Sequence, residues 1–292
     1  IALVASTAPR DQMGYALGMI QTAVFAGASV GPFFGGILAD LIGYRATFLF
    51  SSVLFAAGGA IVFFFVREQF VPVERGSERG VAAIKGSRAW LLTSTVLAMT
   101  SVLILMRFVQ MGGRPILPLF IEDLGGYSEA RAASISGLSF GLMGLTSAIS
   151  SMVLGRRGDR VGHRKILVAC LIGAVVTYVP MAAVMSAWQV IALQGLFGFA
   201  AGGLLPATNA IIAASTPPER RGAVFGFTAS AGAMGGFIGP LVGAGLAAAF
   251  GFRVAFGFLA FVLLVATVVI LWHELSGRFR TPAPVIEEPT RG

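Results

Sequence analysis

Long apolar runs dominate the pattern of hydrophobic and polar positions along this chain. Seven stretches contain no Asp, Glu, Lys or Arg, and each is at least 18 residues long: 12–39, 46–66, 89–106, 132–155, 166–218, 222–252 and 254–273. A helix needs about 20 apolar residues to cross a bilayer. The 53-residue stretch 166–218 has room for two such helices, with a turn near Ser186, Ala187 and Trp188. The pattern therefore predicts eight membrane helices.

The composition agrees with a membrane location. Of the 292 residues, 56% are apolar and only 12% are charged, whereas an ordinary soluble domain has about 25% charged residues. This excludes an ordinary soluble enzyme and predicts an all-α polytopic membrane protein. The predicted spans are 13–38, 46–66, 90–121, 132–154, 166–186, 188–214, 222–248 and 253–273.

The 21 Lys and Arg residues are distributed unevenly between the loops. When alternate loops are assigned to opposite sides of the membrane, 16 basic residues fall on one side and 3 (Arg45, Arg131 and Arg253) on the other. Positive residues favour the cytoplasmic side, so both ends of the sequence are expected in the cytoplasm. The net charge of +8 is then a topology signal, and we expect no nucleic-acid partner.

An internal repeat predicts the architecture. Residues 14–48 align without a gap on residues 222–256, a constant offset of 208, with 12 of 35 positions identical. Parallel repeats of this kind build one class of secondary transporters. Extending the repeat predicts a parent chain of roughly 410–420 residues with two halves of six spans, so eight of twelve helices are expected here.

The same repeat predicts the domain organisation. We expect residues 1–66 to end the N-terminal six-helix bundle and residues 67–89 to form a cytoplasmic linker between the bundles. Residues 90–274 would form the C-terminal bundle, and the Pro-rich residues 275–292 a cytoplasmic tail.

Two motifs carry a family resemblance. Residues 155–165, GRRGDRVGHRK, resemble the G-x-x-x-D-R-x-G-x-R-[RK] loop signature of the major facilitator superfamily. Residues 27–36, GASVGPFFGG, resemble the G-x-x-x-G-P-x-x-G-G signature of the fifth span, which marks exporters in that superfamily. The chain is most similar to the branch of twelve-span drug:proton antiporters of bacteria. This resemblance implies the major facilitator fold and a location in the bacterial inner membrane.

The first motif is expected to form a cytoplasmic gating loop. Its glycines permit a tight reversal, and Asp159 is the only acid among five basic residues. A carboxylate here can accept hydrogen bonds from backbone N–H groups at a helix N-terminus and pair with an arginine of a neighbouring helix. The resemblance implies a latch that holds one conformational state; the alternative is a topogenic loop with a helix cap. The residues assigned to this loop are Gly155, Asp159, Arg160, Gly162, Arg164 and Lys165.

The second motif predicts a face of close helix approach. Glycines at intervals of four let another helix backbone come near, and the proline removes one backbone hydrogen bond and should bend the helix. The repeat gives the eleventh span of the family a similar face. A gating role and simple dense packing both remain open. The residues of this motif are Gly27, Gly31, Pro32, Gly35 and Gly36, with Gly239, Pro240 and Gly243 in the second copy.

Arg107 is the exceptional charge within an apolar span. Gln110 and Arg114 follow it at helical spacings, and Gly112, Gly113, Pro115 and Pro118 are expected to break the helix around them, as in helices that line a cavity. Arg107 either faces such a cavity or extends its charge toward the outer headgroups. Further candidates for a substrate cavity are Gln21, Phe25, Phe140, Met143 and Gln194. Gln194 stands where the matching fourth span of the family's first half has an arginine, which favours a hydrogen-bonding role.

These observations favour a secondary transporter that exports small amphipathic, drug-like compounds by alternating access. Transport of a sugar or another metabolite is the alternative, and a membrane enzyme or receptor a remote one, since no cluster of acids, histidines or metal ligands lies at membrane depth. We expect no metal and no cofactor, a monomer in the lipid bilayer, and protons as the coupling ion. Because all 13 acids lie in loops or at span ends, the proton carrier is expected in helices before residue 1.

Overall fold

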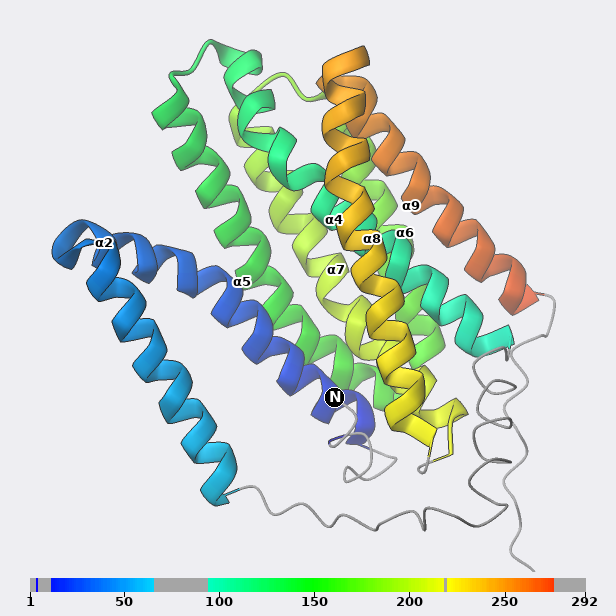
Figure 1. Ribbon diagram of the computed structural model, residues 1–292. Coiled ribbons are helices and arrows are strands. Elements are labelled where there is room, and N and C mark those ends of the chain that lie inside the picture. Colours follow the sequence, from blue (N-terminus) through cyan, green and yellow to red (C-terminus); the bar gives the residue numbers. More distant parts are fainter. Residues whose placement is uncertain (1–3, 5–11, 66–93, 218–219, 276–292) are drawn as a thin grey trace, which may run out of the picture.

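The computed structural model describes residues 4, 12–65, 94–217 and 220–275, and these ranges contain helices and no strand (Figure 1). The segments predicted as the linker (67–89) and the tail beyond residue 275 lie outside the described residues. The helices are α2 (Met13–Phe65), α4 (Ser94–Gly125), α5 (Glu129–Val161), α6 (His163–Tyr178), the 3₁₀ segment η2 (Val179–Ala183), α7 (Ala187–Ser215), α8 (Arg221–Phe250) and α9 (Phe252–Leu275).

The predicted membrane spans correspond closely to these helices. Within the described ranges, seven helical segments are long and apolar enough to cross a membrane. The remaining predicted span is the first part of α2, in which Met13–Ala28 is an apolar helix and helical backbone continues to Gly43. The predicted turn near Ser186 is confirmed, because Ser186 has extended backbone and directly precedes α7.

Two glycines reproduce the internal repeat at the level of the backbone. Gly43 interrupts α2 with φ 79° and ψ 160°. Gly251, 208 residues later, separates α8 from α9 with φ 88° and ψ 162°. These positive φ angles favour glycine. The two copies therefore turn from one span to the next by the same local geometry.

The helices pack in pairs through small residues. The most extensive neighbours are α5 with α7, α4 with α8, and α2 with α5. Between α5 and α7, Thr146 donates to the carbonyl of Gly195 at 2.7 Å, and Ser147 donates to that of Gly198 at 2.8 Å. Close backbone approach with hydroxyl hydrogen bonds is the usual packing of helices in membranes. These hydrogen bonds hold α5 and α7 close together.

The expected break in α4 is wrong. Gly112, Gly113, Pro115 and Pro118 all lie inside one continuous helix. The two glycines serve packing instead: a Cβ on Gly112 would lie 3.0 Å from the carbonyl oxygen of Gly239, and one on Gly113 would lie 2.5 Å from the Tyr178 hydroxyl. Neighbouring helices hold α4 in shape, so local breaking residues do not interrupt it.

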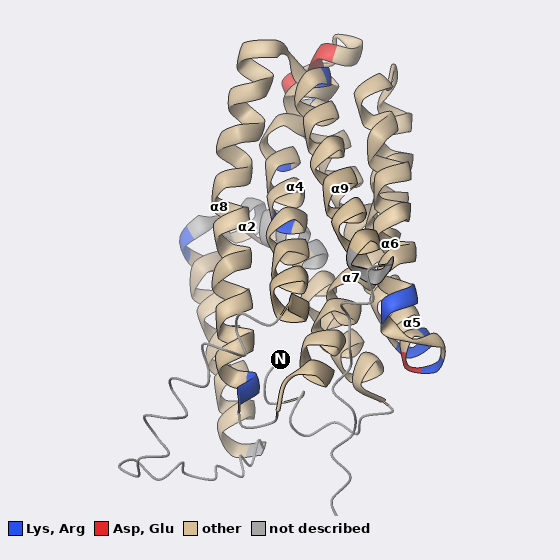
Figure 2. Cartoon of the chain, turned by 90° about the vertical axis from the view of Figure 1, so that its right-hand side faces the viewer, with Lys and Arg blue, Asp and Glu red and all other residues tan. Residues whose placement is uncertain are grey.

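Charged side chains are segregated by position along the helices. Figure 2 shows most acidic and basic residues near the ends of the bundle, with basic turns of α4 and of α2 at intermediate height. Arg107 and Arg114 are the basic residues of α4. Apolar side chains are exposed on the outside, as on the second part of α2, where Phe55 is 83% and Phe63 82% accessible. This distribution suits a bundle surrounded by lipid.

Candidate functional site

The predicted gating loop is mostly helix. Gly155, Asp159 and Arg160 belong to the last turns of α5, and Arg164 and Lys165 to the first turn of α6. Only Gly162, with φ 98°, interrupts the helices. The prediction that several glycines form a reversing loop is therefore wrong: the one left-handed glycine suffices for the turn, and the charged residues between remain in the helix.

Asp159 caps a helix from a distant part of the chain. Its two carboxylate oxygens accept hydrogen bonds from the backbone N–H of Gly14 at 2.7 Å and of Tyr15 at 2.8 Å. These N–H groups open α2 and have no partner inside that helix, and the positive end of the helix dipole adds to the attraction. The expected contact with a helix N-terminus is present in the structure. Its side-chain neighbour is His163, whose Nε2 lies 3.2 Å from a carboxylate oxygen, where an arginine was expected.

Glycines bring the α2 and α5 backbones together at this contact. A Cβ on Gly14 would lie 2.5 Å from the carbonyl oxygen of Gly155, and one on Gly18 would lie 2.5 Å from that of Ser151. One turn further on, Thr22 donates to the carbonyl of Ala148 at 3.0 Å. Gly155 thus serves close approach to α2, and the Asp159 cap ends a continuous α2–α5 interface.

The two copies of the glycine motif differ in their contacts. In α8, Cβ atoms on Gly235, Gly239 and Gly243 would overlap carbonyl oxygens of α4, so this face is a close helix approach as predicted. In α2, Cβ atoms on Gly27 and Gly31 would meet no described atom within 4 Å. Pro32, Gly35 and Gly36 lie in the helical backbone of α2, but their surroundings are outside what the structure describes.

Two adjoining cavities lie between the helices. The first, about 650 Å³, is lined mainly by α4, α7 and α8, with one residue from α2, and the second, about 570 Å³, by α2, α4 and α5. Gln21 and Arg107 line both. Each volume is typical of a small-molecule site. These two side chains therefore mark the junction of one larger interior space.

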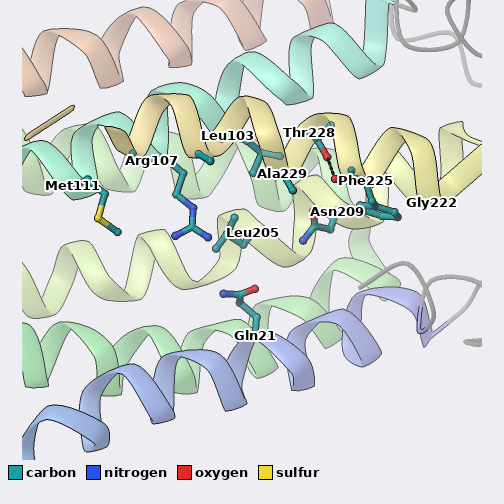
Figure 3. A pocket seen from close by; sticks show the side chains of 14 residues that line it. Gln21, Leu103, Arg107, Met111, Leu205, Asn209, Gly222, Phe225, Thr228 and Ala229 are labelled. Atoms are coloured by element: carbon teal, nitrogen blue, oxygen red, sulfur yellow. Dashed lines mark hydrogen bonds between the residues drawn. The ribbon is translucent and has the colours of Figure 1, made fainter. Parts of the chain in front are cut away.

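Arg107 extends its guanidinium into this space (Figure 3). It lies 13 residues after Ser94, about 20 Å along α4, close to the middle of the helix. Gln110 and Arg114 follow on the same face, and both line the second cavity. The structure thus places Arg107 at the cavity, the first of the two positions that the sequence left open.

The remaining cavity candidates fall into two groups. Phe25, Phe140 and Met143 line the second cavity together with Gln21 and Arg107. Gln194 lines neither of the two cavities: it is 4% exposed and lies in α7, next to the Gly195 that packs on Leu142. Gln194 occupies the position at which the family's fourth span has an arginine, but this correspondence did not predict its location correctly.

Sequence reasoning missed several lining residues of the first cavity. Asn209 is a buried amide of α7, and Thr228 of α8 donates to the carbonyl of Phe225 at 3.1 Å. The signal for Asn209 was available, since an amide inside an apolar span is as unusual as an arginine. Met111 and Leu205 carried no such signal, because apolar residues in apolar spans look alike.

A bundle of membrane-length helices with cavities that carry polar groups defines a polytopic membrane protein with room for a small molecule. Sequence profiles for the Major Facilitator Superfamily match residues 1–156 and 103–290. The chain belongs to this superfamily. It is therefore a membrane transporter and not an enzyme, as its sequence predicts, and its all-α polytopic fold is confirmed.

Proteins with similar sequences include multidrug resistance proteins. Multidrug resistance protein MdtG of Salmonella paratyphi A is 34% identical over 281 residues, which cover 95% of this chain and 68% of the relative. MdtG of Salmonella arizonae matches with the same identity and coverage. The chain thus spans about two thirds of the length of these relatives.

Solved structures share the fold. The human organic anion transporter MFSD10 has a TM-score of 0.75 at 21% identity, with 92% of this chain and 66% of that chain covered. A peptide transporter of the POT type has a TM-score of 0.56 at 20% identity, with 64% and 39% covered. At these identities the likeness concerns the fold alone.

Proposed function

We propose that this protein exports small amphipathic, drug-like compounds by alternating access, in exchange for protons. The observation that carries the proposal is the joint cavity around Arg107, which combines a fixed charge, amides and apolar side chains at mid-membrane depth. Such a mixture binds compounds that are partly polar and partly apolar. The MdtG relatives are multidrug resistance proteins, which supports drugs over sugars or other metabolites.

The Asp159 contact supports alternating access. It joins residues 144 and 145 positions apart through two hydrogen bonds to the end of α2. We assign it as a latch between the two six-helix halves on the cytoplasmic side. Because the bonds depend on one carboxylate and two backbone groups, a small relative movement of α2 and α5 would break both at once.

Proton coupling requires a group that takes up and releases protons in the course of transport. No Asp or Glu is among the described residues that line the two cavities. We therefore assign the proton-carrying acid to the part of the relatives' length that this chain does not span. We further propose that the protein lies in the bacterial inner membrane with both ends of this sequence in the cytoplasm, and that it acts as a monomer.

Cells that lack their own efflux pumps provide the test. The full-length protein is expressed in them, and intracellular accumulation of a panel of neutral, anionic and cationic amphipathic compounds is measured alongside uptake of sugars. Export predicts lower accumulation of some amphipathic compounds and no sugar uptake. Unchanged accumulation of the whole panel would contradict drug export, and sugar uptake would favour the metabolite alternative.

A further inference from the structure

We propose that His163 makes the cytoplasmic latch sensitive to pH: the neutral imidazole holds the latch, and a proton taken up from the cytoplasm releases it. This inference rests on the latch of the proposed function and names the residue that controls it. The relevant cluster consists of Asp159, His163 and the opening turn of α2, at the cytoplasmic end of the molecule and away from the two cavities.

The imidazole of His163 fits into a gap between glycines of two different helices. A Cβ on Gly158 of α5 would lie 2.5 Å from the ring nitrogen Nδ1, and a Cβ on Gly14 of α2 would overlap the ring carbon Cε1. Both positions leave room for the ring because they carry no side chain. Since His163 is the first residue of α6, the ring lies where α2, α5 and α6 meet.

The carboxylate of Asp159 determines which nitrogen of the neutral ring carries the hydrogen. Nε2 lies 3.2 Å from Oδ1 of Asp159. Two acceptors at this distance would repel each other, so Nε2 carries the hydrogen and donates it. The same Oδ1 accepts from the backbone N–H of Gly14 at 2.7 Å, and Oδ2 accepts from that of Tyr15 at 2.8 Å. His163 therefore helps to orient the carboxylate toward α2.

The other ring nitrogen is the observation that carries the proposal. Nδ1 of His163 is buried and has no hydrogen-bond partner among the described residues. A second proton on the ring would have to bind to this nitrogen. The resulting charged N–H would need an acceptor, because a buried charged donor without one is costly. The latched conformation therefore accommodates the neutral ring and disfavours the imidazolium.

The charges around the ring act in both directions. Asp159 favours the imidazolium, whereas α2 and α6 both direct their N-terminal ends, the positive ends of their dipoles, toward it. The other titratable or charged side chains described near the contact are Tyr15 of α2, Arg156, Arg157 and Arg160 of α5, and Arg164 and Lys165 of α6. The arginines and the lysine are positive, so they oppose a further positive charge on the ring.

Opening of the latch removes only the unfavourable part of this environment. Asp159 and His163 are four residues apart on the same side of the contact, so their attraction persists when α2 moves away. The backbone that covers Cε1, next to Nδ1, departs with α2, together with the positive end of that helix. Because the open conformation then binds the proton better, the latch is fully stable above about pH 6.5, where an exposed histidine is neutral, and weakens progressively below it.

Distances between two spin labels test this sensitivity. Met19 of α2 and its counterpart in the repeat, Phe227 of α8, are both exposed, at 50% and 39%, and neither belongs to the latch contact. Each is replaced by a labelled cysteine in the full-length protein, whose other cysteines are replaced by alanine. Pulsed electron paramagnetic resonance in lipid nanodiscs gives the ratio of open to latched conformations. We expect this ratio to rise by about threefold or more between about pH 8 and 5.5.

Variants assign the response to the ring. His163→Gln keeps a donor for Asp159 but cannot take up a proton, so its ratio should not change with pH. His273→Gln is the matched control, since His273 is the other histidine of this sequence and lies in the last turn of α9. It should respond to pH like the wild type. Asp159→Asn should raise the open population at every pH, because it weakens the contact itself.

The outcomes separate this inference from the proposed function. A wild-type ratio that is constant with pH, or a response that persists in His163→Gln, would overturn the role of His163, while an open Asp159→Asn variant would leave the latch standing. If Asp159→Asn does not change the ratio, the latch itself fails. Should His163→Gln fail to fold, His163→Asn offers the same comparison. Drug export is judged separately, by the accumulation of the compound panel.

Discussion

Asp159 shows how one side chain can join two parts of a transporter. Its carboxylate is 7% exposed and meets both the opening N–H groups of α2 and the imidazole of His163. Charge-assisted bonds of this kind are stronger than neutral ones, and the helix dipole adds up to about 2 kcal/mol in partly buried geometry. Removing the charge while keeping the size should therefore weaken the contact selectively.

We expect Asp159→Asn to insert normally into the membrane but to export at roughly a tenth of the wild-type rate or less, from the loss of about 1.4 kcal/mol or more at the latch. Efflux at matched expression checks this. Glu129→Gln, which removes an exposed acid from the opposite end of α5, is the control and should be active. Normal efflux by Asp159→Asn would reduce the motif to a topology signal.

At the scale of elements, the α4–α8 pair depends on glycines that admit no side chain. A Cβ on Gly239 would overlap the carbonyl oxygen of Phe108 and come within 3.1 Å of the Gly112 nitrogen. The obstacle is backbone, which cannot rotate away as a side chain can. The helices would have to separate, with a loss of packing along their length.

Gly239→Ala should therefore lower the stability of the purified protein by about 1–3 kcal/mol, the usual cost of overpacking. A lower midpoint of thermal unfolding in detergent would report it. Gly245→Ala is the control on the same helix, because its Cβ would meet no described atom within 4 Å. If both variants melt like the wild type, the close approach of α4 and α8 is not required for stability.

The sequence predicted the helices and the repeat well because both depend on local patterns. Charge-free runs mark the spans, and Gly43 and Gly251 occupy equivalent turns. Tertiary contacts were harder to foresee. Gly155 suggested a loop, yet its role depends on Gly14, a residue 141 positions away with no pattern to connect them. Arg107 could be found because its charge is unusual in an apolar span, whereas Met111 could not.

At the scale of the whole molecule, orientation depends on the imbalance of 16 basic residues against 3. In a Cys170→Ala background, which removes the one cysteine of this sequence, a cysteine introduced at Ser128 should react with an impermeant thiol reagent added outside intact cells. Ser77→Cys, in the predicted cytoplasmic linker, should react only after the cells are opened. The reverse pattern of labelling would overturn the orientation.

Active export against a gradient is the central claim, and proteoliposomes test it most directly. The purified full-length protein is reconstituted into liposomes. An amphipathic compound that the cells were found to export is placed at equal concentration on both sides of the membrane, and a pH gradient is imposed. The account predicts that the compound accumulates on the acidic side while protons move the other way, and that collapse of the gradient by an ionophore abolishes accumulation. Movement only down the compound's own gradient, unaffected by pH, would contradict proton-coupled export.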